Sequence, residues 1–441
     1  MVHIPTCSKT ANGITKSRVR DIHRIFYGWW IVLAGCIITA LSSGLFFIGF
    51  GFFFEPIRTH FGWSRTIISG AYAVSRIESS ILGPFLGYLI QKIGPRTVMF
   101  IAFVIFGLGY IIISRANSVV MFYAGFVVLA TGADPPGFIA VMTSINNWFF
   151  KNRAKAIGFA MLGLGIGGVT FPPILAFGLN NFSWQSVALT TGIFVAIVGG
   201  LVSFFIRSSP EPYGYLPDGV QEDENINRPS VPDMQRSGRK NTQLIGTKNF
   251  TLSDALKTKA FWVISIGHAQ ALLVVSSTGI HQVPYLENSL GFSKTSAAFA
   301  VMLLTSINMI GQLSGGILAD KFPKQKLAAF TVLGHTLAII SLALATSTLH
   351  IVGYAIIQGL SWGARTPVLT SMRGDYFGRT AFASIMGTSQ SIAIVGMIIG
   401  PLIVGYCADH YSYEMGFYLI SALTAPGFLL LLSLDDHSPQ S

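Results

Sequence analysis

Charged residues and cysteines are both scarce in this chain. Asp, Glu, Lys and Arg make up 11% of its 441 residues, whereas 51% are hydrophobic. Soluble domains carry about 25% charged residues, so the composition excludes a soluble protein and indicates one that lies in a lipid bilayer. The three cysteines, Cys7, Cys36 and Cys407, match no metal-ligand spacing and predict no disulfide.

Motifs for catalysis and nucleotide binding are also missing. The sequence has no H-E-x-x-H motif, no recognisable Ser/His/Asp set and no nucleotide-binding loop. We therefore expect neither enzyme activity nor a cofactor. Energy for any transport should come from a gradient, because no ATP-binding motif is present.

Apolar runs long enough to cross a bilayer recur along the whole chain, where a spanning helix needs about 20 residues. They lie near 28–53, 66–90, 97–114, 118–147, 154–178, 186–206, 260–285, 295–319, 327–346, 350–372, 382–407 and 415–433. Prolines interrupt 118–147 and 350–372, but neighbouring helices can satisfy the backbone groups that proline frees. The sequence predicts an all-α membrane protein with twelve transmembrane helices.

The net charge of +11 reflects topology and does not indicate nucleic-acid binding. With the N-terminus in the cytoplasm, 23 of the 29 Lys and Arg residues fall in inward segments and four in outward loops. Only Arg76 and Arg365 lie within spans. This asymmetry predicts that both termini are cytoplasmic. The segment 1–27 lacks a cleavable signal, so we expect the first span to stay as an anchor.

A polar stretch separates six spans from six. We predict a cytoplasmic tail at 1–27, a six-helix half at 28–206, a cytoplasmic linker at 207–259, a second half at 260–433 and a tail at 434–441. Thr251 to Lys257 could form a short surface helix before the seventh span.

The two halves repeat each other. G-A-D-P-P, which begins at Gly132, aligns with G-A-R-T-P, which begins at Gly363, and the alignment places Asp134 opposite Arg365. Three further pairs of motifs share one constant offset. Gly87-x3-Gln91 is matched by Gly316-x3-Asp320, and F-G-W-S-R at Phe61 is matched by G-F-S-K at Gly291. F-S-W-Q at Phe182 is matched by Y-S-Y-E at Tyr411. Two copies of one membrane half favour a transporter with its site between the halves.

Two segments resemble the major facilitator superfamily, and the resemblance covers the whole chain. G-Y-L-I-Q-K-I-G-P-R, from Gly87 to Arg96, is similar to the family's loop G-x3-D-R-x-G-R-R, with Gln91 in place of the acid. The second copy, from Gly316, keeps the acid as Asp320. The resemblance implies two six-helix halves around a central cavity that the first, fourth, seventh and tenth spans line.

A closer resemblance is to the monocarboxylate-porter and oxalate–formate-antiporter branches. W-F-F-K-N-R-A-K-A-I-G, from Trp148 to Gly158, resembles the signature Y-F-x-K-[RK]-R-x-L-A-x-G, and Tyr27 to Trp30 is a partial match to a second one. The chain departs from the animal porters, which carry a Lys in the first span and an Asp–Arg pair in the eighth. Its eighth span offers only Asn308 and Gln312, so the anion-binding charge has moved or the substrate differs.

Four charges lie in the hydrocarbon zone, where each costs on the order of 2.5–3.5 kcal/mol at the midplane. They are Arg76, Glu78, Asp134 and Arg365. Arg365 is predicted to anchor a carboxylate, because a guanidinium presents a fork of donors that fits two oxygens. The alternative is a structural ion pair, or capping of a helix broken near Pro367.

The acids are candidates for carrying protons. Asp134 is predicted to couple a proton to substrate binding, or else to be a constant partner of Arg365. Arg76 and Glu78 stand two apart in the second span and cannot simply neutralise each other. We predict a gating role for Arg76 and a coupling role for Glu78, with direct substrate contact as the alternative.

Neutral side chains could complete the pocket. We predict substrate contacts from His281, Gln282, Gln390 and Tyr123, and weaker candidates are His268, Ser389, Tyr72, Trp362 and Phe138. His335 is expected to be a satisfied buried histidine. An inward gate is predicted at Asp320, Arg373, Asp375 and Arg379, the alternative for the last three being a solvated loop.

The sequence thus predicts a secondary transporter of a small organic anion, a monocarboxylate, by proton symport with alternating access. The alternatives are an anion exchanger of oxalate–formate type and a proton-driven exporter of amphipathic compounds. Against the exporter, Gly167-Gly168 is followed by Val-Thr-Phe-Pro and not by the G-P-x2-G-G pattern. A sensor that does not transport is a further alternative. We expect a monomer in a bacterial inner membrane, although nothing excludes a eukaryotic plasma membrane.

Overall fold

The structure is a computed structural model that describes residues 26–63, 65–133, 135–219, 250–292 and 294–434. In these ranges the chain is helical and contains no strand. The N-terminal helices are α1 (Tyr27–Ser42), the π-helix η1 (Ser43–Phe47), α2 (Phe50–Phe61), α3 (Arg65–Ile93), α4 (Pro95–Ser114), α5 (Val119–Ala133), α6 (Pro135–Trp148), α7 (Arg153–Asn181) and α8 (Trp184–Ser203). Two 3-10 turns follow, η2 (Glu211–Tyr213) and η3 (Pro217–Gly219). The C-terminal helices are α10 (Leu252–Leu256), α11 (Lys259–Asn288), α12 (Lys294–Ala319), α13 (Lys324–Ala343), α14 (Thr348–Phe377), α15 (Phe382–His410), α16 (Tyr413–Thr424) and α17 (Pro426–Leu432).

These elements make twelve transmembrane passes in two pseudo-symmetric halves, as predicted. The first pass combines α1, η1 and α2, the fourth α5 and α6, and the twelfth α16 and α17, while single helices make the other nine. Ten passes are long and apolar enough to cross a membrane within the described part of the chain. The other two, α3 and α14, are the helices that carry charges in their middle turns.

Proline does not end the tenth pass, because α14 continues through Pro367 as one helix of 30 residues. An irregularity without a proline is the π-helical turn η1 in the first pass. There the Ser43 hydroxyl donates to the Leu164 carbonyl of α7 at 2.8 Å, and the Tyr110 hydroxyl donates to the Leu45 carbonyl. These bonds attach the distorted turn to its neighbours.

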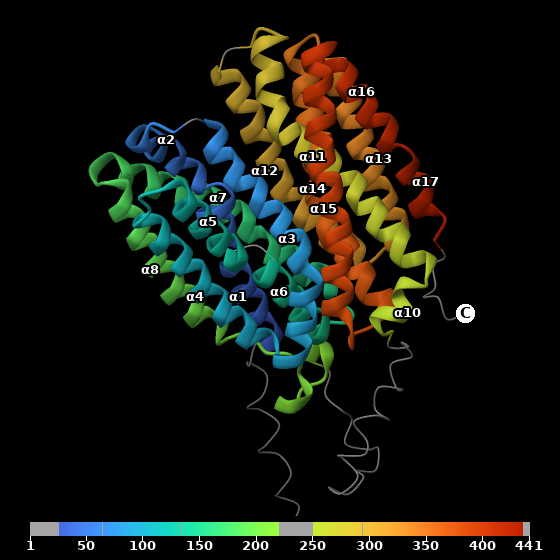
Figure 1. The fold of residues 1–441 in the computed structure, drawn as a ribbon. Coiled ribbons are helices and arrows are strands. Elements are labelled where there is room, and N and C mark those ends of the chain that lie inside the picture. The colour runs from blue at the N-terminus through green and yellow to red at the C-terminus, as the bar shows by residue number, and fades with distance from the viewer. Residues whose placement is uncertain (1–25, 64, 134, 220–249, 293, 435–441) are drawn as a thin grey trace, which may run out of the picture.

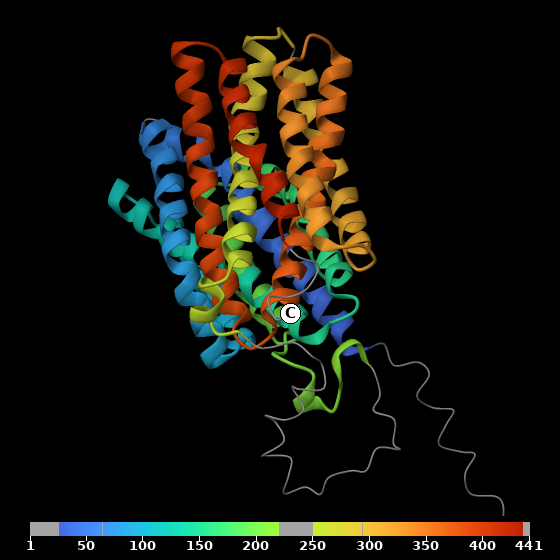
Figure 2. The same ribbon diagram turned by 90° about the vertical axis from the view of Figure 1, so that its right-hand side faces the viewer.

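Figures 1 and 2 show the N-terminal helices as one group and the C-terminal helices as another, with α3 beside α15. The interface repeats itself as the sequence does. A Cβ on Gly316 of α12 would lie 2.6 Å from the Ala154 carbonyl oxygen of α7. At the equivalent positions of the repeat, Gly87 of α3 lies as tightly against Ala383 of α15. Glycine at both positions lets the helix backbones approach closely.

Helix starts near the linker use standard capping chemistry. Thr251 and Asp254 form a capping box at α10, which is the short helix expected from the sequence. The Thr258 hydroxyl accepts the Phe261 N–H at the start of α11. We call the end of the molecule that holds α10, η2, η3 and the first turn of α7 the linker end, and the opposite end the far end.

Candidate functional site

Arg365 is a buried cation whose donors are not used. It lies on α14 with 4% of its surface exposed. Its Nε and Nη1 groups are buried and have no hydrogen-bond partner among the described residues. An unpaired buried donor costs about 1–3 kcal/mol, and more when it is charged. The side chain is therefore poised to bind an anion that supplies the missing acceptors.

A neutral polar pair adjoins Arg365. Gln358 lies two helical turns before it, which puts both on one face of α14. The Gln358 Oε1 atom lies 2.9 Å from Nδ1 of His335 on α13, and all three side chains are buried. We expected His335 to be satisfied, but its Nε2 atom and the Gln358 Nε2 atom have no partner in the described part of the chain.

A second buried arginine lies further along the same helix. Arg373 is 1% exposed, and its Nε group donates to the Ser389 hydroxyl of α15 at 3.0 Å. Its Nη2 atom lies 2.9 Å from Nδ1 of His268 on α11, and Nη1 has no partner among the described residues. Ser389 also shares a 2.8 Å hydrogen bond with Ser265. Arg373 therefore joins three helices in the interior.

This placement differs from the loop position that we expected for Arg373, and its role in a gate stays a prediction. We grouped it with Asp375 and Arg379 in an inward gate, because the tenth apolar run ends near residue 372. The helix instead continues to Phe377, and the Arg373 side chain turns toward His268. Arg365 and Arg373 are about 12 Å apart along the helix axis, as the rise per residue of an α-helix requires. No carboxylate of the described residues pairs with either one.

The predicted neutral contacts are mostly occupied elsewhere. The Gln282 Oε1 atom of α11 accepts from the Tyr354 hydroxyl of α14 at 2.9 Å, which leaves its Nε2 group unpartnered in the described structure. His281 donates through Nε2 to the Pro401 carbonyl of α15 at 2.9 Å. Tyr123 donates to the Ile67 carbonyl of α3 at 2.7 Å. His281 and Tyr123 thus tie helices together within their own halves.

Three amide side chains keep free polar atoms. The Gln312 Nε2 group donates to Asn308 Oδ1 at 3.0 Å along α12, leaving Gln312 Oε1 and Asn308 Nδ2 buried without partners in the described ranges. Gln390 of α15 follows Ser389 directly, and its buried Oε1 atom also has no hydrogen-bond partner among the described residues. Among the weaker candidates, Trp362 and Phe138 are partly buried against the hydrophobic cores of their own halves.

The predicted N-terminal charges are only partly described. Glu78 Oε1 accepts from the Thr131 hydroxyl of α5 at 2.5 Å, and Glu78 also borders a cavity of about 270 Å³ whose other walls are apolar side chains of α3. Asp134 lies outside the described residues, as do the side chains of Arg76 and Tyr72. The predicted relation between Asp134 and Arg365 therefore stays a prediction.

The linker end is closed by contacts between the halves. The Asp320 carboxylate, just beyond α12, accepts the Ala154 and Lys155 backbone N–H groups at the start of α7, at 2.9 and 2.8 Å. Burial raises the pKa of Asp320, although these two hydrogen bonds act in the opposite direction. The Gln91 side chain donates to the Thr380 carbonyl at 2.9 Å and accepts from the Ser384 hydroxyl at 2.6 Å.

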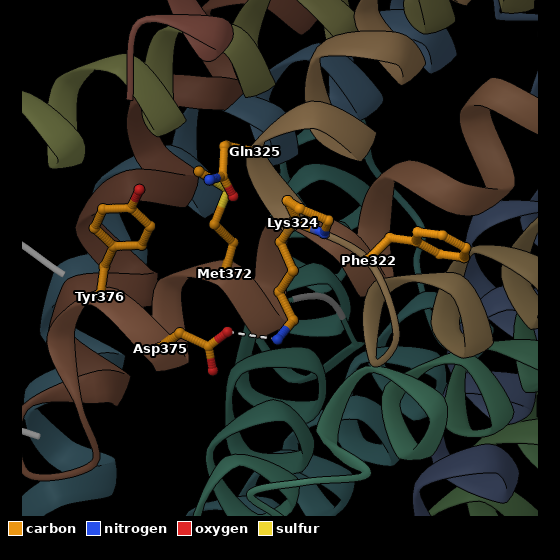
Figure 3. Close-up of a pocket in the computed structure, with 7 residues that line it drawn as sticks. Phe322, Lys324, Gln325, Met372, Asp375 and Tyr376 are labelled. Atoms are coloured by element: carbon orange, nitrogen blue, oxygen red, sulfur yellow. Dashed lines mark hydrogen bonds and ion pairs between the residues drawn. The ribbon is translucent and has the colours of Figure 1, made fainter. Parts of the chain in front are cut away.

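Asp375 is the centre of an ion-pair network at the same end. It binds Arg153 of α7 at 2.6 Å and Lys324 of α13 at 2.5 Å, so one carboxylate connects the two halves. Figure 3 shows Asp375 and Lys324 facing each other beside Met372 and Tyr376, at a surface pocket of about 280 Å³. The gating role predicted for Asp375 stays a prediction, and the network includes Arg153, which we had noted only as part of a signature.

The segment that follows α8 covers the linker end. The Asp218 carboxylate accepts the Phe150, Lys151 and Asn152 backbone N–H groups at 2.9, 2.6 and 3.1 Å. Glu211 pairs with Arg379 of the other half at 2.8 Å. Sequence reasoning missed Asp218 and Glu211, because we predicted residues 207–259 only as a polar cytoplasmic linker. The run P-E-P-Y-G-Y-L-P-D-G, which is rich in turn formers, was the available signal.

The chain is similar to known transporters over nearly its whole length. Monocarboxylate transporter 13 of Rattus norvegicus is 26% identical, with 94% of this chain and 92% of the relative covered. The oxalate:formate antiporter of Oxalobacter formigenes is 23% identical, with 90% and 88% covered.

Solved structures show the same fold. The proton:xylose symporter XylE bound to 6-bromo-6-deoxy-D-glucose has a TM-score of 0.67 at 15% identity, covering 93% of this chain and 96% of its own. The transporter FucP in its outward conformation has a TM-score of 0.67 at 14% identity, covering 92% and 99%. Residues 35–364 and, overlapping them, 284–441 match the Major Facilitator Superfamily, so this chain is a multi-pass membrane protein that belongs to that superfamily.

Proposed function

We propose that this chain is a secondary transporter that moves a small organic anion, a monocarboxylate, together with a proton. The observation that carries the proposal is Arg365, a guanidinium 4% exposed with two buried donors that lack partners in the described structure. A carboxylate supplies two oxygens in the geometry that such a fork binds. The names of the relatives, a monocarboxylate transporter and an oxalate:formate antiporter, point to the same class of substrate.

The surroundings of Arg365 favour an anion over a neutral substrate. Arg373 lies within electrostatic range of Arg365, and both guanidinium groups are buried. Two buried cations that pair with no carboxylate of the described residues are costly in a low-dielectric interior, and an anionic ligand offsets that cost. Asp134 and Glu78 are the acids that we propose for proton coupling in the N-terminal half.

Alternating access requires that one end close while the other opens. The hydrogen bonds and ion pairs that join the halves through described residues gather at the linker end, around Asp320, Asp375 and Gln91. We place this end in the cytoplasm, because most Lys and Arg residues lie on that side. On this assignment the cytoplasmic end is the closed one, and the gate contacts must break for release to the cytoplasm.

Uptake into proteoliposomes tests the proposal. The purified chain would be supplied with labelled lactate, pyruvate, formate, oxalate, acetate and an uncharged sugar, each with and without an inward proton gradient. We expect one or more monocarboxylates to accumulate only with the gradient, and the sugar not to accumulate. Gradient-driven uptake of the sugar alone, or of no compound, would refute the proposal.

Exchange without protons is the second candidate, favoured by the similarity to an oxalate:formate antiporter. It predicts that uptake of an external carboxylate depends on carboxylate trapped inside and is unaffected by the proton gradient. The same vesicles, loaded with unlabelled oxalate or formate, distinguish the two transport modes.

A further inference from the structure

The hydrogen bond between Arg373 and His268 fixes the protonation state of the imidazole. The Arg373 guanidinium can only donate, and its Nη2 atom lies 2.9 Å from Nδ1 of His268. Nδ1 must therefore be the acceptor. His268 is neutral in this arrangement, with its single ring proton on Nε2. Any event that takes Arg373 away from Nδ1 leaves this nitrogen free to bind a proton.

The positive charges around His268 oppose the binding of a proton to Nδ1 unless a negative charge arrives with it. Among the described residues, the charged or titratable groups within electrostatic range of His268 are Arg365 and Arg373 of α14 and His335 of α13. The adjoining helix α15 contributes the neutral Ser389 hydroxyl, and α11 itself contributes Ser265. A proton on His268 would add a third positive charge beside two buried arginines. Only an anion in the same place removes this obstacle.

Arg373 is also equipped to take an anion from Arg365. Its Nη1 group is buried without a partner in the described structure, while Nη2 is held by the imidazole. Each terminal nitrogen carries two N–H groups, so a carboxylate that binds Nη1 and takes the Nη2 N–H now directed at Nδ1 displaces His268. Arg373 is about two helical turns closer to the linker end than Arg365, which is the direction of release into the cytoplasm.

We propose that Arg373 and His268 form a second substrate site, at which the carboxylate replaces the imidazole on the guanidinium and His268 takes up the transported proton. The proposal rests on the proposed function, but it assigns the transported proton to His268 in the C-terminal half in place of Asp134 or Glu78. The balance is simple: one carboxylate joins Arg373, one proton from water joins Nδ1 of His268, and the charge of the site is unchanged. When the carboxylate leaves, Arg373 recovers Nδ1 and expels the proton.

His268→Gln is the matched variant for a test. The amide oxygen of glutamine can accept from Arg373 as Nδ1 does, but it cannot take a proton at these pH values. In proteoliposomes at about pH 6 outside and about pH 7.5 inside, we expect gradient-driven accumulation of the carboxylate to fall by roughly tenfold or more, within the usual range of coupling between sites. Exchange of labelled for unlabelled carboxylate needs no net proton movement and should continue.

Three further variants locate the proton. His350→Gln changes an exposed histidine at the far end of α14 and should keep accumulation, while Glu78→Gln and Asp134→Asn test the acids of the N-terminal half. Accumulation at the native level by His268→Gln would overturn the inference. So would a result in which only Glu78→Gln or Asp134→Asn loses accumulation. A native chain that moves no carboxylate would refute the proposed function itself, which is a separate result.

A binding measurement covers the case in which His268→Gln also loses exchange. Solubilised protein in weak buffer with a pH indicator reports the protons taken up when the transported carboxylate is added. The native chain should take up about one proton per carboxylate bound, and His268→Gln close to none. Equal proton uptake by both chains would overturn the inference, because the proton would then belong to another group.

Discussion

Replacing Arg365 by alanine distinguishes an anion anchor from a structural cation. The native guanidinium is 4% exposed and keeps two buried donors without partners in the described structure. A hydrogen bond to a charged group contributes about 1.5–3 kcal/mol, so two of them to one carboxylate contribute at least about 3 kcal/mol. Since about 1.4 kcal/mol is a factor of ten, Arg365→Ala should weaken carboxylate binding by about a hundredfold or more.

The same substitution should leave the fold intact. Removing one partner of a buried ion pair typically costs about 3–5 kcal/mol, because the other charge is left buried alone. Arg365 has no such partner among the described residues, so its removal relieves a desolvation cost. We therefore expect the unfolding temperature of solubilised Arg365→Ala to equal or exceed that of the native chain.

The assay is titration of the transported carboxylate into solubilised protein, with unfolding temperature measured in parallel. Arg365→Lys keeps the charge but loses the planar fork, and should weaken binding by about tenfold. Arg115→Ala is the matched control, because Arg115 is exposed at the far end. Native affinity in Arg365→Ala, or a large loss of stability in place of affinity, would refute the anchor.

Three more predictions concern the closed linker end, measured by spin-label distances between the halves in solubilised protein. Asp375→Ala leaves Arg153 buried and unpaired, so the closed form should lose about 3–5 kcal/mol and the distances lengthen; unchanged distances would contradict this. Burial raises the pKa of Asp320 above its usual 3.8 in the closed form, so the closed form binds this proton more tightly than a hydrated open form. The closed form should therefore gain stability relative to the open form as the pH falls through the raised pKa of Asp320, and lose that gain as the pH rises. Asp320→Asn should abolish this pH dependence. Gly316→Leu puts a side chain against the Ala154 carbonyl and should hold the linker end open, whereas native distances would show that the interface can yield.

Hydropathy predicted all twelve passes, including α3 and α14, which contain charges. The prediction succeeds because a helix that crosses the bilayer needs a long apolar run. The interface repeats itself in a way that the sequence analysis did not foresee. Gly87 and Gly316 are matched positions of the repeat, and they lie against Ala383 and Ala154, which are related to each other by the same offset.

The site was harder to predict, because its geometry depends on where a helix ends. Hydropathy stops the tenth run near residue 372, since Arg373 and Asp375 resemble the start of a polar loop. The helix nevertheless continues to Phe377, so Arg373 and Asp375, which are separated by Gly374 alone, point in different directions. One reaches His268 in the interior, and the other reaches Arg153 across the linker end. Apolarity alone does not distinguish these surroundings.

Equivalent positions in a repeat share a place in the fold but not a chemistry. Gln91 and Asp320 both lie near the end of a helix and both reach into the opposite half. An amide donates and accepts, so Gln91 engages a carbonyl and a hydroxyl at the start of the eleventh pass. A carboxylate only accepts, so Asp320 binds the free N–H groups at the start of α7, where the helix dipole also favours a negative charge. By the same reasoning, the repeat predicts equal depth for Asp134 and Arg365 in the two halves, and the opposite charges predict different partners.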